Sequence, residues 1–380
     1  MLPKAVRTRL FPWFWLRLAW LTVCLAGLLL AAPLRAQDVQ EKVDVDDLSR
    51  NFVVHPPKGY NAQQHYPVVI LFPGQNQDAE EMARLTHFNQ LADKEGIIAV
   101  YPIATRGHWN IGVRPEQATA TPRRGYGRHG GMGGGGYPGG GYPGGGYPGG
   151  GGGGYPGGGG QGGGQSGGQN PDDSRNKPEP ADDVAFLNQM LDQLATRYSL
   201  DTHRIYATGL GDGGLMALRV GCAMADRVAA IAPVGAALPK TMICLPSRAV
   251  PALFIDGTED PIVPYGGGTY KPGQFHVLSA EDSAKAWARF DRCNEKPAQD
   301  KLPALQKGGK ETKTFTFSAC QDNAQVALYA VKDAGNTWPG GEQYMSEKEV
   351  GKTSDALNAN ETIWSFLATK KIAGDSGVGK

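Results

Sequence analysis

The chain has 380 residues, of which 40% are hydrophobic, and its 38 basic and 37 acidic residues almost cancel. Nucleic-acid-binding proteins need a clear excess of Lys and Arg on one face, so this balance argues against that class of function. Outside one glycine-rich segment, the length suits a single large α/β domain.

Residues 1–36 have the pattern of a secretory signal peptide. A basic start is followed by an apolar stretch over residues 18–32, and Leu34-Arg35-Ala36 offers a small residue for cleavage. The stretch is short for a membrane span, so we expect an extracellular or periplasmic protein with no stable membrane span. Cleavage would remove five basic and no acidic residues, leaving 33 basic against 37 acidic ones. Thr22-Val23-Cys24 resembles a lipoprotein box, which leaves retention of the leader as an anchor open.

Four cysteines follow the leader, an even number in an exported chain: Cys222, Cys244, Cys293 and Cys320. Three pairings are possible, and we favour Cys222–Cys244 and Cys293–Cys320 because each closes a short local loop. Free buried thiols are the alternative, although an oxidising compartment favours disulfides. The sequence has no Cys-x-x-Cys or His-Glu-x-x-His spacing, so we expect neither a metal site nor a cofactor.

A low-complexity segment interrupts the chain. Residues 125–169 include 29 glycines among 45 residues, with four Tyr-Pro pairs that begin at Tyr137, Tyr142, Tyr147 and Tyr155. Such a composition buries too little apolar surface to offset its ordering entropy, so we expect a disordered insertion over residues 123–170. The insertion is either tolerated, or its tyrosines contact a surface, a glycan or another protein. One domain would then comprise residues 37–122 and 171–372, followed by a flexible tail over 373–380.

The rest of the sequence alternates short apolar runs with helical patterns. An edge strand is expected over 50–55, and buried strands over 68–72, 97–101, 205–208, 228–234, 252–256 and 326–331. Helices are expected over 80–94, 182–198, 214–224, 280–290 and 358–367. This alternation predicts an α/β fold with a mostly parallel central sheet and helices on both faces. Ligands of such sheets bind in a crevice at the carboxyl ends of the strands.

One turn resembles a nucleophile elbow without its nucleophile. Residues 204–214 read RIYATGLGDGG, an apolar strand followed by a glycine turn and a helix. In α/β-hydrolases the centre of the G-x-S-x-G elbow is a serine. Gly211 stands at that position here.

Five segments in order carry a family resemblance. They are residues 72–74 (FPG), 182–187 (DDVAFL), 208–214 (TGLGDGG), 256–265 (DGTEDPIVPY) and 335–341 (GNTWPGG). Together they resemble secreted polyhydroxybutyrate depolymerase-type and feruloyl-esterase-type α/β-hydrolases, over nearly the whole chain outside the leader and the glycine insertion. The resemblance implies an α/β-hydrolase fold and a carboxylic-ester hydrolase ancestry.

The resemblance implies that only one of the three catalytic-triad residues, the aspartate, is present in this chain. Asp260 stands at the position of the aspartate, Gly211 at that of the serine and Asn336 at that of the histidine. Pro73 replaces a histidine of the oxyanion loop. Glycine cannot form an acyl intermediate, and an asparagine amide does not accept a proton near neutral pH. The backbone N–H groups of Gln75 and Asp212 are the expected remnant of the oxyanion hole.

Trp109 and Trp338 are expected to line the pocket, with a core tryptophan as the alternative for Trp338. Asp260 would otherwise hold its own turn through backbone hydrogen bonds. Two routes could restore catalysis: Asp212 as an aspartyl nucleophile, or a displaced histidine base, His276 or His108.

The sequence leaves three hypotheses about the function open. The first is a non-catalytic relative of an esterase that binds a small ester, polyester or glycan. The second is an active ester hydrolase that uses non-standard residues. The third is an interaction or matrix protein that binds a surface or a protein through the Gly-Tyr-Pro segment.

Overall fold

The computed structural model describes residues 38–113, 181–303 and 310–373. The expected signal peptide, the glycine-rich insertion and almost all of the expected tail lie outside these ranges. Within them, no helix is both long and apolar enough to cross a bilayer.

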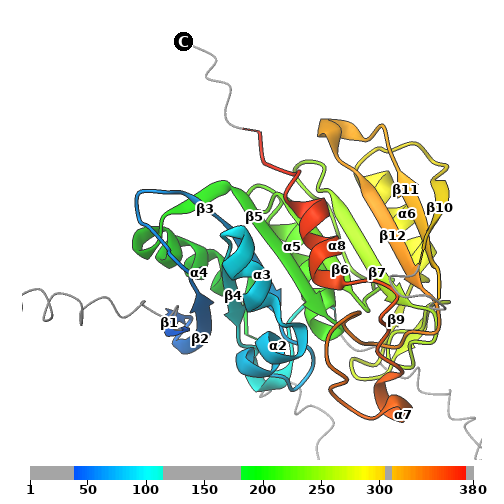
Figure 1. Cartoon of the computed structure of the whole chain (residues 1–380), viewed down its shortest axis with the longest axis horizontal. Helices are drawn as coiled ribbons and strands as arrows, with labels where there is room; N and C mark the ends of the chain where they lie inside the picture. The colour runs from blue at the N-terminus through cyan, green and yellow to red at the C-terminus, as the bar shows by residue number, and fades with distance from the viewer. Residues whose placement is uncertain (1–37, 114–180, 304–309, 374–380) are drawn as a thin grey trace, which may run out of the picture. The chain divides into compact units, whose positions relative to one another are not determined.

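A ten-stranded sheet forms the centre of the described domain, in the order β1-β2-β4-β3-β5-β6-β7-β12-β11-β10 (Figure 1). The strands are β1 (Val39–Val45), β2 (Leu48–His55), β3 (Tyr66–Phe72), β4 (Ile98–Pro102), β5 (Leu200–Leu210), β6 (Ala230–Val234), β7 (Ala252–Gly257), β10 (Ala298–Leu302), β11 (Thr312–Phe317) and β12 (Val326–Val331). The pairs from β4 to β12 are parallel, and the pairs at the two edges are antiparallel. A separate hairpin consists of β8 (Gly268–Tyr270) and β9 (Phe275–Val277).

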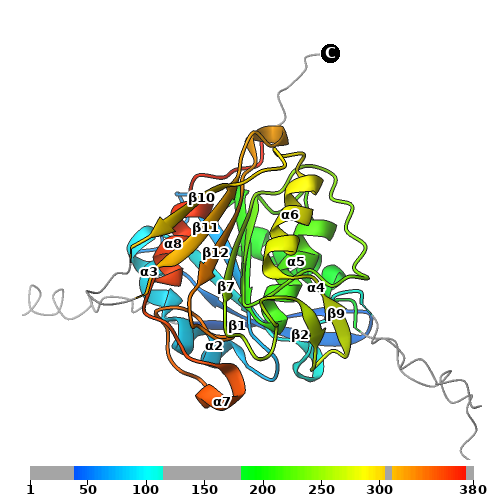
Figure 2. The same ribbon diagram turned by 90° about the vertical axis from the view of Figure 1, so that its right-hand side faces the viewer.

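Helices cover both faces of the sheet. They are α2 (Ala79–Thr86), α3 (Phe88–Glu95), α4 (Asp183–Arg197), α5 (Asp212–Ala223), α6 (Ala280–Phe290), α7 (Glu347–Val350) and α8 (Ala359–Leu367). Figure 2 shows α3 and α8 on one side of the sheet and α5 and α6 on the other. The parallel strands, the covering helices and the sharp turn between β5 and α5 define an α/β-hydrolase fold, which confirms the predicted fold class.

The core divides into two layers because side chains alternate along each buried strand. On β3, Val68, Ile70 and Phe72 pack in the layer that contains α4, α5 and α6. Val69 and Leu71 pack in the opposite layer, with α2, α3 and α8. A strand buried on both faces is therefore apolar throughout, which is why the sequence pattern located it.

Two of the expected elements were wrong in detail. The strand expected at the edge over 50–55 is internal, because β1 pairs with it on the outer side. The helix expected over 80–94 is two helices, α2 and α3, that meet at His87. His87 has φ 55° and ψ 24°, a left-handed conformation that ends the first helix.

Two disulfides link segments of the domain that are distant in the sequence. Cys222 of α5 is bonded to Cys244 in the segment between β6 and β7, and Cys293 after α6 is bonded to Cys320 before β12. These are the pairings expected from the sequence. Each closes a loop with a sequence separation of 22 or 27 residues. Loops of this length correspond to about 3 kcal/mol of stabilisation per bridge in the chain-entropy account.

Candidate functional site

Gly211 forms the bend between β5 and α5. Its φ of 56° and ψ of −112° lie in a region where residues with a Cβ are strained and glycine is not. The Gly211 N–H donates to the carbonyl of Val234 over 2.9 Å, which ties the bend to the neighbouring strand. At the flanking Gly213, a Cβ would lie 2.0 Å from the carbonyl oxygen of Phe72, so the close packing of α5 on β3 requires glycine there.

Asn336 lies opposite this bend, on the loop that follows β12, and only 2% of it is exposed. Its amide nitrogen Nδ2 donates to Oδ2 of Asp260 over 2.7 Å and to the carbonyl of Gly235 over 2.9 Å. These two acceptors fix which end of the amide carries the nitrogen. The other end faces the bend: a Cβ on Gly211 would lie 2.8 Å from Oδ1 of Asn336.

Both carboxyl oxygens of Asp260 accept hydrogen bonds. Its Oδ1 accepts hydrogen bonds from the N–H groups of Ile262 and Val263, each over 2.8 Å, while Oδ2 accepts from Asn336. Burial raises the pKa of Asp260 to about 7, and the hydrogen bonds from Asn336, Val263 and Ile262 oppose this rise. The carboxyl therefore holds its own turn and also fixes the orientation of the Asn336 amide.

A second buried carboxyl, that of Asp256, lies beside this group and was not predicted as a site residue. Its Oδ1 accepts from the N–H of Ala236 over 3.0 Å, whereas Oδ2 has no hydrogen-bond partner among the described residues. Burial raises its pKa well above the ordinary value, and the nearby Asp260 raises it further. Burial and the neighbouring Asp260 thus both favour the neutral form of the Asp256 carboxyl. It belongs to the same 256–265 segment as Asp260, so that motif was the signal that could have found it.

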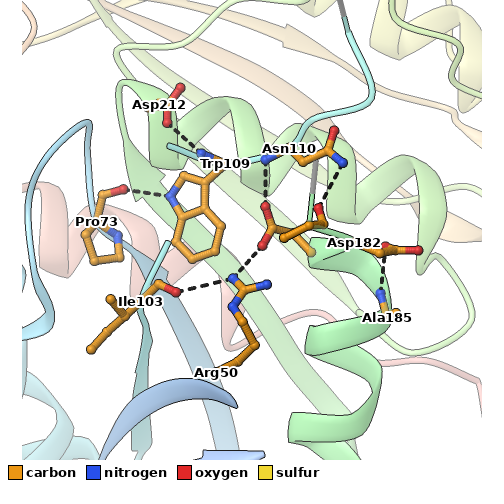
Figure 3. A network of polar contacts seen from close by, with 10 residues as sticks. Arg50, Pro73, Ile103, Trp109, Asn110, Asp182, Ala185 and Asp212 are labelled. Atoms are coloured by element: carbon orange, nitrogen blue, oxygen red, sulfur yellow. Dashed lines mark hydrogen bonds and ion pairs between the residues drawn. The ribbon is translucent and has the colours of Figure 1, made fainter. Parts of the chain in front are cut away.

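Asp212 begins α5, directly after the bend. Its carboxylate accepts from the N–H of Trp109 over 3.0 Å and from the hydroxyl of Tyr270 over 3.1 Å. Burial raises the pKa of this carboxyl, and the two hydrogen bonds counteract the rise. Figure 3 shows Asp212 joined to Trp109, whose ring nitrogen in turn donates to the carbonyl of Pro73 over 2.9 Å. Both carboxylate oxygens thus hold neighbouring segments in place, which argues against Asp212 as a nucleophile.

Hydrogen bonds near this network link the described residues that precede residue 114 to those that follow residue 180. Asp183 at the start of α4 pairs with Nη2 of Arg50 over 2.5 Å and accepts from the N–H of Asn110 over 2.6 Å (Figure 3). The amide of Asn110 donates to the carbonyl of Ala181 over 2.9 Å. The described residues on the two sides of the insertion are therefore bonded to each other.

A cavity of about 320 Å³ opens at the bend. It is lined by Gly74, Gln75, Asn76, Gln77, Glu81, Arg84, Leu85, Leu210, Gly211, Asp212, Ile262, Tyr270, Asn336, Tyr344 and Met345. The structure thus brings together Gly211, Asn336 and the two expected oxyanion residues, Gln75 and Asp212, on one cavity wall.

The two tryptophans do not line this cavity, contrary to the sequence prediction. Trp109 is 5% exposed and Trp338 is 1% exposed. The ring nitrogen of Trp338 donates to Oδ1 of Asn360 over 2.8 Å, and the Asn360 amide donates to the carbonyl of Thr86. Large rings with a satisfied N–H are favourable core residues, and this is what both tryptophans are.

Neither candidate histidine lines the cavity. His108 is exposed, and its Nε2 lies 3.4 Å from the amide nitrogen of Gln75. His276 is on β9, where its Nε2 lies 3.5 Å from the hydroxyl of Thr269. His108 therefore contacts the oxyanion loop rather than the bend.

The chain resembles esterases in sequence. No family model matches the chain. It is 29% identical over 208 residues to the putative esterase NocK of Nocardia uniformis subsp. tsuyamanensis, a match that covers 52% of this chain and 60% of that protein. It is 36% identical over 163 residues to feruloyl esterase B of Piromyces equi, covering 41% of this chain and 29% of that protein. Among solved structures, the acetyl xylan esterase from Aspergillus awamori is 9% identical with a TM-score of 0.48, covering 87% of this chain and 99% of that one.

The fold described above is of the α/β-hydrolase type, and both sequence relatives are named as esterases. The chain spans 60% and 29% of the length of the two sequence relatives described above.

Proposed function

We propose that this chain is a secreted α/β-hydrolase-fold protein of the polyhydroxybutyrate depolymerase and feruloyl esterase type that binds an acyl ligand without hydrolysing it. The observation that carries the proposal is the pair Gly211 and Asn336 at the bend. The first has no side chain, and the second presents an amide where a general base is required. Loss of a nucleophile or base in a comparable triad costs on the order of a millionfold in kcat.

The two tyrosines that line the cavity support the same proposal. The hydroxyl of Tyr270 donates to the carboxyl of Asp212, and the hydroxyl of Tyr344 donates to the main-chain carbonyl of Asn336. Burial raises the pKa of both phenols well above the ordinary value, so neither is a phenolate near neutral pH.

Secretion is supported by the signal-like leader and by the two disulfides, since disulfides form and persist in oxidising compartments. The ligand class is supported by the chemistry of the cavity, in which polar groups at the bend adjoin the apolar or aromatic side chains of Tyr270, Tyr344 and Met345. A small ester, a polyester end or a feruloylated glycan has this combination of a carbonyl and an apolar body.

Labelling with a fluorophosphonate probe, read by intact mass, tests the proposal. The parent protein should remain unlabelled, because the bend has no serine. The variant Gly211→Ser with Asn336→His serves as the positive control and should gain one adduct. A stoichiometric adduct on a serine of the parent would overturn the proposal.

An active hydrolase that uses non-standard residues is the second candidate. The sequence similarity to esterases favours it. It predicts hydrolysis of short p-nitrophenyl esters by the parent above the buffer rate and without a serine adduct. A rate indistinguishable from that of buffer would reject this candidate.

A further inference from the structure

The amide of Asn336 presents a fixed acceptor to the cavity. Its nitrogen is engaged by Asp260 and by the carbonyl of Gly235. Rotating the amide by half a turn would place Oδ1 against two acceptors and would lose both hydrogen bonds. None of the described residues donates to Oδ1, which belongs to a side chain that lines the cavity although Asn336 is only 2% exposed.

A side chain at position 211 would crowd this acceptor, because a Cβ there would lie 2.8 Å from Oδ1. Glycine at 211 therefore leaves Oδ1 uncovered on this side. A ligand donor can approach it from the cavity that both residues line. The donor has to come from the ligand or from water, since the neighbouring wall supplies none to Oδ1.

A backbone donor lies on the other side of the bend. Asp212 is the first residue of α5, so its N–H has no partner within the helix. The positive end of the helix dipole also points there, which favours a partly negative oxygen. The cavity therefore offers a donor for a carbonyl oxygen and, across Gly211, an acceptor for an N–H or O–H group.

These two requirements discriminate between acyl derivatives. An ester has no donor, so it leaves Oδ1 of Asn336 unsatisfied once water is excluded. A carboxylate is an acceptor only, and it would also approach the buried carboxyl of Asp212, which lines the same cavity. A primary carboxamide carries an acceptor oxygen and a donor nitrogen on one carbon, and it is neutral.

We propose that the cavity beside Gly211 selects an aromatic primary carboxamide, whose oxygen binds at the start of α5 and whose nitrogen donates to Oδ1 of Asn336. The aromatic body would pack against Tyr270, Tyr344 and Met345, which line the same cavity. This inference rests on the proposed function, because it takes the site to bind its ligand without cleaving it.

Calorimetric titration at pH 7.5 with cinnamamide, methyl cinnamate and cinnamate tests the inference. These probes share one apolar body and differ only at the acyl group. Cinnamamide should bind about tenfold or more tightly than either of the others. Equal or weaker binding of cinnamamide, or no binding at millimolar concentration, would overturn the inference.

Two variants test whether the preference for cinnamamide depends on Asn336. Asn336→Ala removes the acceptor and should reduce the advantage of cinnamamide to about twofold or less. Gly211→Ala keeps the acceptor but fills the space in front of it, so it should have the same effect even if Asn336→Ala does not fold. Asn294→Ala, an exposed asparagine that does not line the cavity, is the matched control and should keep the full preference. An undiminished preference in both cavity variants would contradict the assignment to Asn336.

Chromatography of the ligands after each titration separates the two proposals. Intact ligands without amide preference would overturn the inference and leave the proposed function standing. Release of cinnamate from methyl cinnamate would overturn the proposed function itself.

Discussion

Nδ2 of Asn336 lies 2.7 Å from Oδ2 of Asp260, so an amide donates to the carboxyl that orients the general base in triad hydrolases. The hydrogen-bond geometry between the acid and its partner is thus preserved, whereas the ability of that partner to accept a proton is absent. In the proposed function, this pairing holds the shape of the site without supplying a general base.

The buried carboxyl of Asp260 should make stability depend on pH. Burial raises the pKa of this carboxyl to about 7, well above its ordinary range. A carboxyl whose pKa is higher in the folded state stabilises the fold below its unfolded pKa, and this contribution is lost as the pH rises from about 4 to about 7. Urea unfolding at several pH values should therefore show a steeper loss of stability over this window in the parent than in Asp260→Asn.

Asp256 and Asp291 also have raised pKa values from burial, but both are present in the parent and in the variant. Their contribution largely cancels in the comparison. Identical pH slopes for parent and variant would show that Asp260 is ionised at neutral pH in the folded protein and would contradict the expected burial effect.

Gly211 and Asn336 should be energetically coupled. Gly211→Ala introduces a Cβ 2.8 Å from Oδ1 of Asn336 at a positive φ, so we expect a destabilisation of about 1–3 kcal/mol. Part of this cost is the contact with the amide, which Asn336→Ala removes. A double-mutant cycle measured by urea unfolding should give a coupling energy of about 0.5 kcal/mol or more. Additive effects would mean that the two residues do not touch.

The ion pair between Arg50 and Asp183 should matter far more than a surface pair. The two side chains are 5% and 1% exposed, and Asp183 also holds the N–H of Asn110. Removing one partner leaves a buried charge, so Arg50→Ala should cost about 3–5 kcal/mol by urea unfolding. Lys301→Ala breaks the exposed pair with Glu311 and is the control, which should leave the unfolding midpoint nearly unchanged. Similar effects of the two changes would refute the structural role assigned to Arg50.

Deleting residues 125–169 should leave the domain folded. The amide of Asn110 bonds to the carbonyl of Ala181, so the segment is inserted between two points that are already joined. If the segment is the flexible insertion that its composition predicts, a shorter loop should stabilise the protein by roughly 1 kcal/mol. Circular dichroism and urea unfolding of the deletion variant measure this. A large loss of stability would show that the segment packs on the domain.

The same deletion variant tests the interaction or matrix hypothesis. If it binds surfaces or partners as well as the parent does, that hypothesis is rejected.

The sequence predicted the central part of the fold well because buried parallel strands are apolar on both faces. The expected strand over 326–331 and helix over 280–290 coincide with β12 and α6. The strands at the edges of the sheet were harder to predict from the sequence. The strand β10 is exposed along its whole length, so no apolar pattern marked it. The break at His87 depends on a single left-handed residue within a continuous helical pattern.

For the site, the motif order located Gly211, Asp260 and Asn336, but not the packing around them. The motifs could not show that Trp109 and Trp338 are core residues, because a tryptophan with a satisfied N–H and one that lines a pocket occur in the same segments. Asp256 was overlooked because it ends a buried apolar strand, where a carboxyl with an unpaired oxygen is unexpected.

The most direct test is hydrolysis of p-nitrophenyl butyrate by the parent and by Gly211→Ser with Asn336→His, prepared in parallel. We expect the parent to match the buffer rate and the double variant to show measurable, fluorophosphonate-sensitive turnover. Turnover by the parent at the rate of an ordinary esterase would contradict the account.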